Sequence, residues 1–424
     1  MDTTPLWRAS APISSSHAPL SGPVQCDVLV VGGGITGVTL AWLLASQGRD
    51  VLLLEAQSLG GGSTGGSTGN LYESVGGDGV QALLQRWGRD AARLALEARA
   101  AAVHFIGQCA QDAPEVAFRR CPHLVYAQTP QDQKFIDGEY EALAQLGATV
   151  ARQAQVPHPL PAPCGSVLAL HGQAQFQPQA YITHLAREAA ARGARLHEHS
   201  RVIGLDPDTK TATTASATVQ AREIVLATHT PKGFHLMQAA MPVHREYGLA
   251  LPWSDAAPGP GIYWWHGQQT LSVRTHTDLQ GGPFLVCIGQ EHKTGHHDAN
   301  ASLAQLRDQV QRMLQVHMNG ATDSRSPLRY QWSAQNYRSA DSLPYIGRDA
   351  SGCLVATGFG ADGLVWGTVA AQVLAAQLAG DKPALGELCS PHRFTPLKSA
   401  KTFVEAATTS AKALIQDYLT DRQE

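Results

Sequence analysis

The sequence predicts an α/β protein with two domains: a Rossmann-type domain, and an α+β domain with a mainly antiparallel sheet. A glycine-rich turn at residues 32–37 stands directly between an apolar strand pattern and a helix pattern, which is the arrangement of a Rossmann βαβ unit. After residue 240 the chain becomes β-like and rich in aromatic residues, which favours antiparallel strands.

Length and composition fit this class. A chain of 424 residues can form two cores, and 43% hydrophobic with 16% charged residues is typical of globular proteins. The net charge of −3 gives no reason to expect a nucleic-acid partner. No apolar run reaches membrane-spanning length. Small molecules are therefore the expected ligands.

Cysteine usage indicates a reducing compartment. The seven cysteines are scattered and never spaced C-x-x-C, which argues against a disulfide framework and against a zinc site, so no metal is expected. The first 25 residues form a Pro/Ser-rich arm without the features of a secretory signal. These patterns predict a cytoplasmic protein.

The elements follow from local patterns taken in chain order. Residues 26–31 form a continuous apolar run, as in a buried parallel strand; 35–47 have helical spacing, Gly48 ends the helix, and 50–54 form the second strand. Later helices are predicted at 79–112, 131–146, 179–192, 302–318, 363–379 and 400–420. Strands are predicted at 195–205, 218–227, 345–346 and 353–357, with β structure through 241–295.

The turn Gly32-Gly-Gly34-Ile-Thr-Gly37 carries the strongest chemical signal. Gly32 permits the tight turn, Gly34 lets the backbone approach a pyrophosphate, and Gly37 allows close packing of helix and strand. Glu55 follows 23 positions after Gly32, where its carboxylate can accept hydrogen bonds from ribose hydroxyls. The spacing predicts a dinucleotide with an unphosphorylated ribose, which leaves NAD and FAD open.

A second loop, residues 60–70, is packed with glycine, serine and threonine. Alone it would indicate a flexible linker. Directly after Glu55, it suits donors that lie against a flat cofactor and its phosphates. Only a long cofactor would need both loops.

These motifs resemble the D-amino acid oxidase-like superfamily of FAD-dependent oxidoreductases, which includes glycine, sarcosine and γ-glutamylputrescine oxidases. The similarity extends from the TPLWRASAP arm through GGSTGGSTGN, EIVLAT, GQEHKTG and DSLPYIGR to LVATGFGADGLVWGT. GQEHKTG and the 62–70 loop are most similar to a subgroup that carries a C-terminal Rieske domain. Only about thirty residues follow Arg393, without paired Cys/His motifs, so no Rieske cluster is expected.

The resemblance implies a set of FAD contacts. Glycines 32, 34 and 37 would hold the pyrophosphate, and Glu55 the adenosine ribose. Ser63, Thr64, Ser67 and Thr68 would hold the central part of FAD, Val202 the adenine through its backbone, and the Gly358–Gly363 turn the flavin ring. The full expected set is Gly32, Gly34, Ile35, Thr36, Gly37, Glu55, Ala56, Gly62, Ser63, Thr64, Ser67, Thr68, Asn70, Leu71, Val202, Ala227, Thr228, Gly347, Gly358, Phe359, Gly360, Asp362, Gly363 and Leu364.

Three further expectations concern the attachment of FAD and the division of the chain. At the positions where family members attach flavin covalently, this chain has Asn70 and Gln335, neither of which can form the bond, so FAD is expected to be noncovalent. In the family's A-T-G turn, His229 replaces the glycine after Ala227-Thr228. The FAD-binding domain is expected at 1–105, 175–235 and 327–395, the substrate domain at 106–174 and 236–326, and a helical tail at 396–424.

Substrate contacts are expected from the aromatic β segment. Arg274 follows Tyr263-Trp264-Trp265, and arginine suits bidentate binding of a carboxylate. Tyr247 and Tyr72 are the other candidate catalytic residues. Cys287 stands where related oxidases have a lysine that promotes reaction with oxygen, which leaves oxygen and a separate redox partner both open as electron acceptor.

The predicted function is FAD-dependent oxidation of the C–N bond of a small amine or amino acid, by hydride transfer to flavin N5. The resulting imine is hydrolysed. Two alternatives stay open: oxidation of a hydroxy acid or other C–OH substrate, and a flavin-bound subunit of a larger redox complex.

Overall fold

The computed structural model describes residues 4–11, 17–74, 79–230, 241–253, 259–277, 282–295, 297–314 and 328–393. The chain divides into two compact units. The parallel-sheet unit contains Ile13–Thr64, Pro178–Val243 and Asn336–Glu424, and the antiparallel-sheet unit contains Met1–Pro12, Gly65–Gln177 and His244–Gln335. The expected division assigned residues 1–12 and 65–105 to the FAD domain, whereas both segments group with the antiparallel sheet. The predicted helix 400–420 lies outside the described residues.

The parallel-sheet unit is built as a Rossmann-type layer structure. Its elements are β1 (Val24–Val31), α2 (Ile35–Ser46), β2 (Val51–Leu54), α5 (Pro178–Ala191), β9 (Arg195–His197), β10 (Gly204–Asp206), β11 (Thr211–Thr213), β12 (Thr218–Leu226), β18 (Tyr345–Arg348), β19 (Leu354–Thr357), the 3-10 helices η2 (Gly360–Asp362) and η3 (Pro391–Arg393), α8 (Gly363–Leu378) and α9 (Ala384–Leu388).

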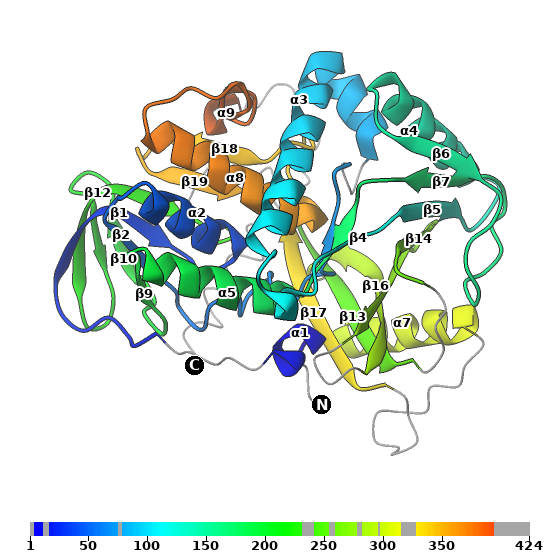
Figure 1. Cartoon of the computed structure of the whole chain (residues 1–424), viewed down its shortest axis with the longest axis horizontal. Helices are drawn as coiled ribbons and strands as arrows, with labels where there is room; N and C mark the ends of the chain where they lie inside the picture. The colour runs from blue at the N-terminus through cyan, green and yellow to red at the C-terminus, as the bar shows by residue number, and fades with distance from the viewer. Residues whose placement is uncertain are drawn as a thin grey trace. The chain divides into compact units, whose positions relative to one another are not determined.

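The central strands of this unit are parallel and apolar. The strand order is β10-β11-β12-β1-β2-β9, and β19 adds to β12. Strand β1 pairs in parallel with both β12 and β2, and its last four residues are all buried, as expected for a strand covered on both faces. Helix α2 packs between α5 and α8 (Figure 1).

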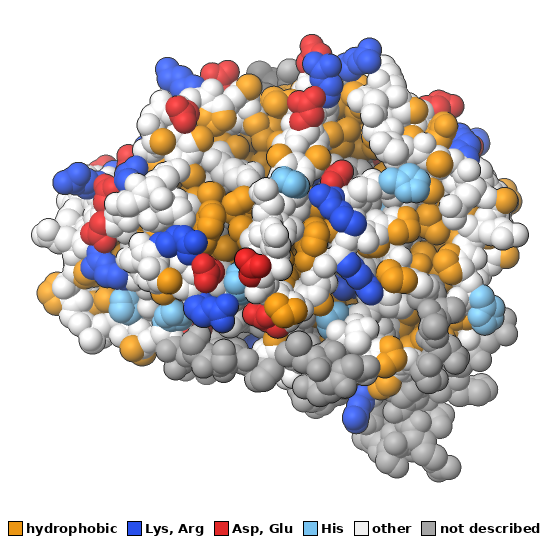
Figure 2. Space-filling model, viewed as in Figure 1, with side chains coloured by type: hydrophobic (Ala, Val, Ile, Leu, Met, Phe, Trp, Pro, Cys, Tyr) orange, Lys and Arg blue, Asp and Glu red, His pale blue; other side chains and the backbone are white. Residues whose placement is uncertain are grey.

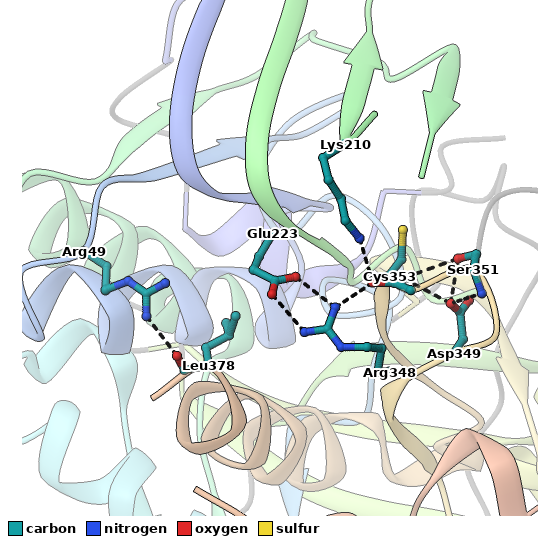
Figure 3. Close-up of polar contacts among 9 residues, drawn as sticks. Arg49, Lys210, Glu223, Arg348, Asp349, Ser351, Cys353 and Leu378 are labelled. Atoms are coloured by element: carbon teal, nitrogen blue, oxygen red, sulfur yellow. Dashed lines mark hydrogen bonds and ion pairs between the residues drawn. The ribbon is translucent and has the colours of Figure 1, made fainter. Parts of the chain in front are cut away.

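Polar contacts attach the β18–β19 hairpin to β12 (Figure 3). Both Nη atoms of Arg348 donate to the carboxylate of Glu223 on β12, each at 2.9 Å. The Gly352 carbonyl in the hairpin turn accepts from Arg348 Nη1 at 2.6 Å and from Lys210 Nζ at 2.9 Å. Asp349 Oδ1 accepts the backbone N–H of Ser351 at 2.9 Å. The hairpin in turn positions the glycine turn that follows β19.

The predicted strand 195–205 is wrong in its middle. Strand β9 ends at His197 and β10 begins at Gly204. Between them the Glu198 carboxylate accepts the backbone N–H groups of His17 and Leu59, at 2.8 and 2.7 Å. These long-range bonds turn the chain out of the sheet, so Val202 is buried but does not lie in a strand.

The antiparallel-sheet unit combines a large sheet, a small sheet and helices. Its elements are α1 (Leu6–Ser10), β3 (Asn70–Leu71), α3 (Gly79–Cys109, kinked at Gly88), η1 (Pro114–Val116), β4 (Arg119–Arg120), β5 (His123–Ala127), α4 (Gln133–Gln145), β6 (Val150–Gln153), β7 (Val167–Leu170), β8 (Ala174–Gln175), β13 (Val243–Pro252), β14 (Ile262–His266), β15 (Leu271–Thr277), β16 (Pro283–Lys293), α7 (Ala299–Leu314) and β17 (Tyr330–Tyr337).

The large sheet has two different faces. Its order is β17-β13-β16-β15-β14-β5-β7-β6. From β13 to β6 the neighbouring strands are antiparallel, except for the parallel pair β14–β5. One face packs against α7 with an apolar core, and α7 lies along β16 in Figure 1. Because side chains alternate along a strand, the other face carries the intervening residues. We call it the polar face; it includes His123, Trp264, Ser272, Arg274 and His276.

Charge is dispersed over the surface. Figure 2 shows basic and acidic side chains intermixed over the described part of the face drawn there, in keeping with the small net charge of −3. Within the described ranges, no helix is long and apolar enough to cross a membrane.

Candidate functional site

The glycine turn of the parallel-sheet unit leaves no room for side chains at two positions. Gly32 has φ +109°, and a β-carbon there would overlap the Ala227 carbonyl oxygen. A β-carbon on Gly37 would overlap the carbonyl oxygen of Gly32. The turn therefore lies directly against the end of β12 and the start of α2, as the fingerprint requires.

The N-terminus of α2 is open for a ligand. Gly34 is its N-cap residue and provides no side-chain cap, while the Ile35 N–H donates to Thr64 Oγ1 at 3.1 Å. Uncapped N–H groups and the helix dipole favour a phosphate at this position. The bare backbone of Gly34 and the nearby hydroxyl of Thr64 thus fit the pyrophosphate of FAD.

Glu55 closes β2 and is held in place by backbone donors. Its Oε2 accepts the Gly33 N–H at 2.7 Å, and its Oε1 accepts the Gln57 N–H at 2.8 Å. A carboxylate has about four lone-pair sites, so each oxygen retains acceptor capacity for a ribose hydroxyl. The Ser200 N–H donates to the Glu55 carbonyl at 2.8 Å, which brings the segment containing Val202 to the end of this strand.

His229 follows Ala227-Thr228 in a backbone conformation that glycine favours. Its φ is +66°, in the left-handed region that favours glycine, and Thr357 Oγ1 donates to its carbonyl at 2.6 Å. The ring packs edge-on against Tyr337, and burial lowers the pKa of His229 to about 4. The chain therefore makes a left-handed turn after Ala227-Thr228 with a buried histidine side chain in place.

The second glycine turn leads from β19 into α8. Gly358 and Gly360 have φ values of +77° and +60°, and Gly347 on β18 has +132°. A short 3-10 helix, η2, ends at Asp362, and α8 begins at Gly363 without a side-chain cap. An open helix N-terminus can stabilise the negative charge of a reduced flavin, as expected for Phe359 to Leu364.

In the antiparallel-sheet unit, Asn70 starts a neutral polar cluster on the polar face. Its Nδ2 donates to Tyr72 Oη at 2.9 Å and to Ser272 Oγ at 3.4 Å. Trp264 Nε1 also donates to Tyr72 Oη, at 3.0 Å. His123 packs against the rings of Tyr72 and Trp264, with centroid distances of 5.1 and 4.7 Å.

Several polar atoms of this neutral cluster have no hydrogen-bond partner in the described part of the chain. Among the described residues, Asn70 Oδ1 and both ring nitrogens of His123 are buried without a hydrogen-bond partner. Burial lowers the pKa of His123 to about 3, so its ring is neutral at physiological pH. Buried polar atoms are normally paired, and their concentration here indicates a ligand site.

Arg274 also lies on the polar face, and its guanidinium is largely engaged. Its Nη1 donates to the carbonyls of Thr68, Gly69 and Phe176 at 3.2, 2.5 and 3.2 Å. Its Nε donates to the Thr275 carbonyl at 3.4 Å. Burial, followed by the nearby Arg119, lowers the pKa of Arg274 to about 9. Of the guanidinium nitrogens, only Nη2 has no acceptor among the described residues and is left for a substrate carboxylate.

Tyr247 lies on the opposite side of the same sheet. It belongs to the apolar core under α7, and its hydroxyl contacts His292 Nε2 at 3.1 Å. Cys287 lies in the same core, and burial raises the pKa of its thiol. The structure therefore brings together Tyr72 and Asn70 with Trp264, but not with Tyr247.

Sequence reasoning missed His123, Trp264 and Ser272. The alternation within Tyr263-Trp264-Trp265 could have separated Trp264 from its neighbours, because adjacent strand residues face opposite sides. His123 carried no local signal. In the described ranges, no cluster of three His, Cys, Asp or Glu residues is placed to hold a metal.

Comparison with known proteins finds two curated relatives with different extents of similarity. The chain is 27% identical over 426 residues to YhfW of Bacillus subtilis, named as a Rieske 2Fe-2S iron-sulfur protein, covering 97% of this chain and 80% of YhfW. It is 38% identical over 92 residues to γ-glutamylputrescine oxidoreductase of Escherichia coli, covering 22% and 21% of the two chains.

The fold is shared with a solved glycine oxidase structure. Glycine oxidase from Geobacillus kaustophilus superposes with a TM-score of 0.70 at 18% identity, covering 88% of this chain and 99% of that one. The sequence profile described as "DAO: FAD dependent oxidoreductase" matches residues 27–377. The chain belongs to this DAO family of FAD-dependent oxidoreductases.

Proposed function

We propose that the protein oxidises the C–N bond of a small amine or amino acid. The observation that carries the proposal is the neutral polar cluster on the polar face, in which Asn70 Oδ1 and the His123 ring offer buried, unused acceptors beside Tyr72 and Trp264. An amine nitrogen supplies N–H donors for such acceptors. The names of glycine oxidase and γ-glutamylputrescine oxidoreductase support the same substrate class.

The reaction needs an uncharged amine. Bound FAD supplies the two-electron acceptor for a hydride from the carbon that carries the amine, which leaves an imine for hydrolysis by water. Burial disfavours the protonated form of an amine, and neither Asn70 nor neutral His123 offers a negative charge to hold that form. These residues would bind the amine as a donor and orient its carbon.

The same geometry disfavours the alternative of C–OH oxidation. A hydroxy acid must lose its hydroxyl proton to a base, and an effective base has a pKa near the working pH. With a pKa of about 3, His123 is a weak proton acceptor. An amine in its neutral form needs no such base before hydride transfer.

Electron acceptor and compartment are part of the proposal. Either oxygen or a separate redox partner would reoxidise FAD. Cys287, which stands where related oxidases have a lysine, lies in the apolar core rather than on the polar face. All seven cysteines are free thiols, which supports the expected cytoplasmic location.

Anaerobic stopped-flow mixing of the flavin-loaded protein with a panel of amines, amino acids and hydroxy acids tests the proposal. We expect at least one amine or amino acid to bleach the visible flavin absorbance and release a carbonyl product. Bleaching by hydroxy acids alone would contradict it.

A further inference from the structure

We propose that Trp7, Arg274 and Trp332 are positioning residues of the cofactor site, which fix the Gly66–Gly69 loop through its carbonyl groups. The inference rests on the FAD of this family and on the predicted contact of the loop with FAD. It does not depend on the substrate.

Every carbonyl along this loop is bonded to a buried donor. Trp332 Nε1 donates to the Gly66 carbonyl at 2.9 Å, and Trp7 Nε1 donates to the Ser67 carbonyl at 2.8 Å. Arg274 Nη1 donates to the next carbonyls, those of Thr68 and Gly69. The donors come from α1, β15 and β17, which are far apart in sequence.

The donors themselves are rigid. Trp7 is 0% exposed, while Trp332 and Arg274 are each 2% exposed. The Arg274 guanidinium lies 5.0 Å from the centre of the Trp7 ring, within the range of a cation–π contact. Trp7 and Trp332 share one apolar cluster. Buried side chains that contact one another hold their donors at fixed positions.

The amide groups of the loop are left for another partner. Among the described residues, the N–H groups of Gly66, Thr68 and Gly69 donate to no acceptor, whereas the Asn70 N–H donates to Thr68 Oγ1 at 3.1 Å. Successive free N–H groups form a site for an electron-rich acceptor. Because its carbonyl groups are bonded to protein donors, the loop is left with N–H groups that can donate to FAD.

Arg274 adds charge to this arrangement. No carboxylate of the described residues pairs with it, and hydrogen bonds from a charged donor are about twice as strong as neutral ones. A β-carbon on Gly69 would lie 2.5 Å from Arg274 Nη1 and 2.9 Å from the Phe176 carbonyl oxygen. Only glycine lets the guanidinium approach the loop, so Gly69 and Arg274 act together.

The experiment compares Trp7→Phe, Trp332→Phe and Arg274→Met with the control Trp265→Phe, whose indole packs on the other side of the sheet. Each full-length protein is stripped of flavin and titrated with FAD. Removing one neutral donor should raise the Kd for FAD about fivefold, and Arg274→Met should raise it more than about tenfold. The control should stay within about twofold of the parent.

A second readout separates positioning from general loosening. The reduction potential of the bound flavin should become more negative in the three loop variants, because the loop holds the central part of FAD and a displaced cofactor moves its flavin ring away from the donors that stabilise the reduced form. The Trp7→Phe and Arg274→Met effects on Kd should be non-additive, since both act on one loop. Unchanged Kd and potential in all three variants, or equal changes in Trp265→Phe, would overturn the proposal. An absence of amine oxidation by the parent would leave this comparison intact.

Discussion

Gly37 lies so close to the Gly32 carbonyl oxygen that a β-carbon would overlap it. We therefore expect Gly37→Ala to abolish FAD binding and to destabilise the apoprotein by about 1–3 kcal/mol, as other overpacking substitutions do. Urea unfolding and FAD titration measure both effects. The control is Gly259→Ala, where nothing lies within 4 Å of the added carbon; a parental Kd in Gly37→Ala would refute the assigned turn.

His123 and His276 make stability depend on pH. Desolvation lowers both pKa values to about 3, below the ordinary value of 6.5. The unfolded chain therefore binds protons between pH 6.5 and 3 that the folded chain does not, and stability falls as pH falls through this window. Each histidine adds a slope of up to roughly 1.4 kcal/mol per pH unit.

Denaturant unfolding between pH 7 and pH 5 measures this slope. His123→Phe should make the loss of stability on acidification shallower, by about one proton's contribution. A slope identical to that of the parent would show that His123 is solvated.

At the scale of elements, the β18–β19 hairpin depends on packing more than on its ion pair. The side chains of Arg348 and Glu223 are 46% and 27% exposed, and exposed pairs contribute about 0–1 kcal/mol. Arg348→Met should therefore lower the free energy of unfolding by less than about 1 kcal/mol while FAD still binds. Chemical unfolding with a parallel FAD titration checks both, and loss of FAD would show that the pair sets the Gly358–Gly363 turn.

The sequence predicted elements well where local pattern decides them. Strand β1, helix α2 and strand β2 follow from an apolar run, helical spacing and Gly48. The break between β9 and β10 at residues 198–203 could not be predicted. It depends on long-range hydrogen bonds, which the backbone N–H groups of His17 and Leu59 donate to the Glu198 carboxylate. The side of the sheet on which Tyr247 lies could not be predicted either, because alternation gives two faces and only the packing of α7 shows which of them is covered.

The whole molecule divides into units with separate cores. The glycine turn, Glu55 and the family could be predicted, since each depends on short motifs. The carbonyl contacts of Trp7 and Trp332 could not, because they join residues up to 266 positions apart.

Noncovalent FAD is the prediction that belongs to the whole protein. Asn70 donates hydrogen bonds to Tyr72 and Ser272. Its amide is not a nucleophile and cannot form a covalent bond to the flavin. After acid precipitation, the yellow colour should remain in the supernatant. A yellow pellet would show a covalent bond. Free FAD at 100 times its Kd should stabilise the apoprotein by about 2.7 kcal/mol.

The most direct test of C–N oxidation uses a matched pair of substrates. An amino acid that reduces the flavin in the panel is compared anaerobically with the hydroxy acid of the same carbon skeleton. We predict that the amino acid reduces the flavin, faster as pH rises and its amine loses a proton, and releases the keto product. Reduction of the flavin by the hydroxy acid at a rate equal to or above that of the amino acid would contradict the proposed function.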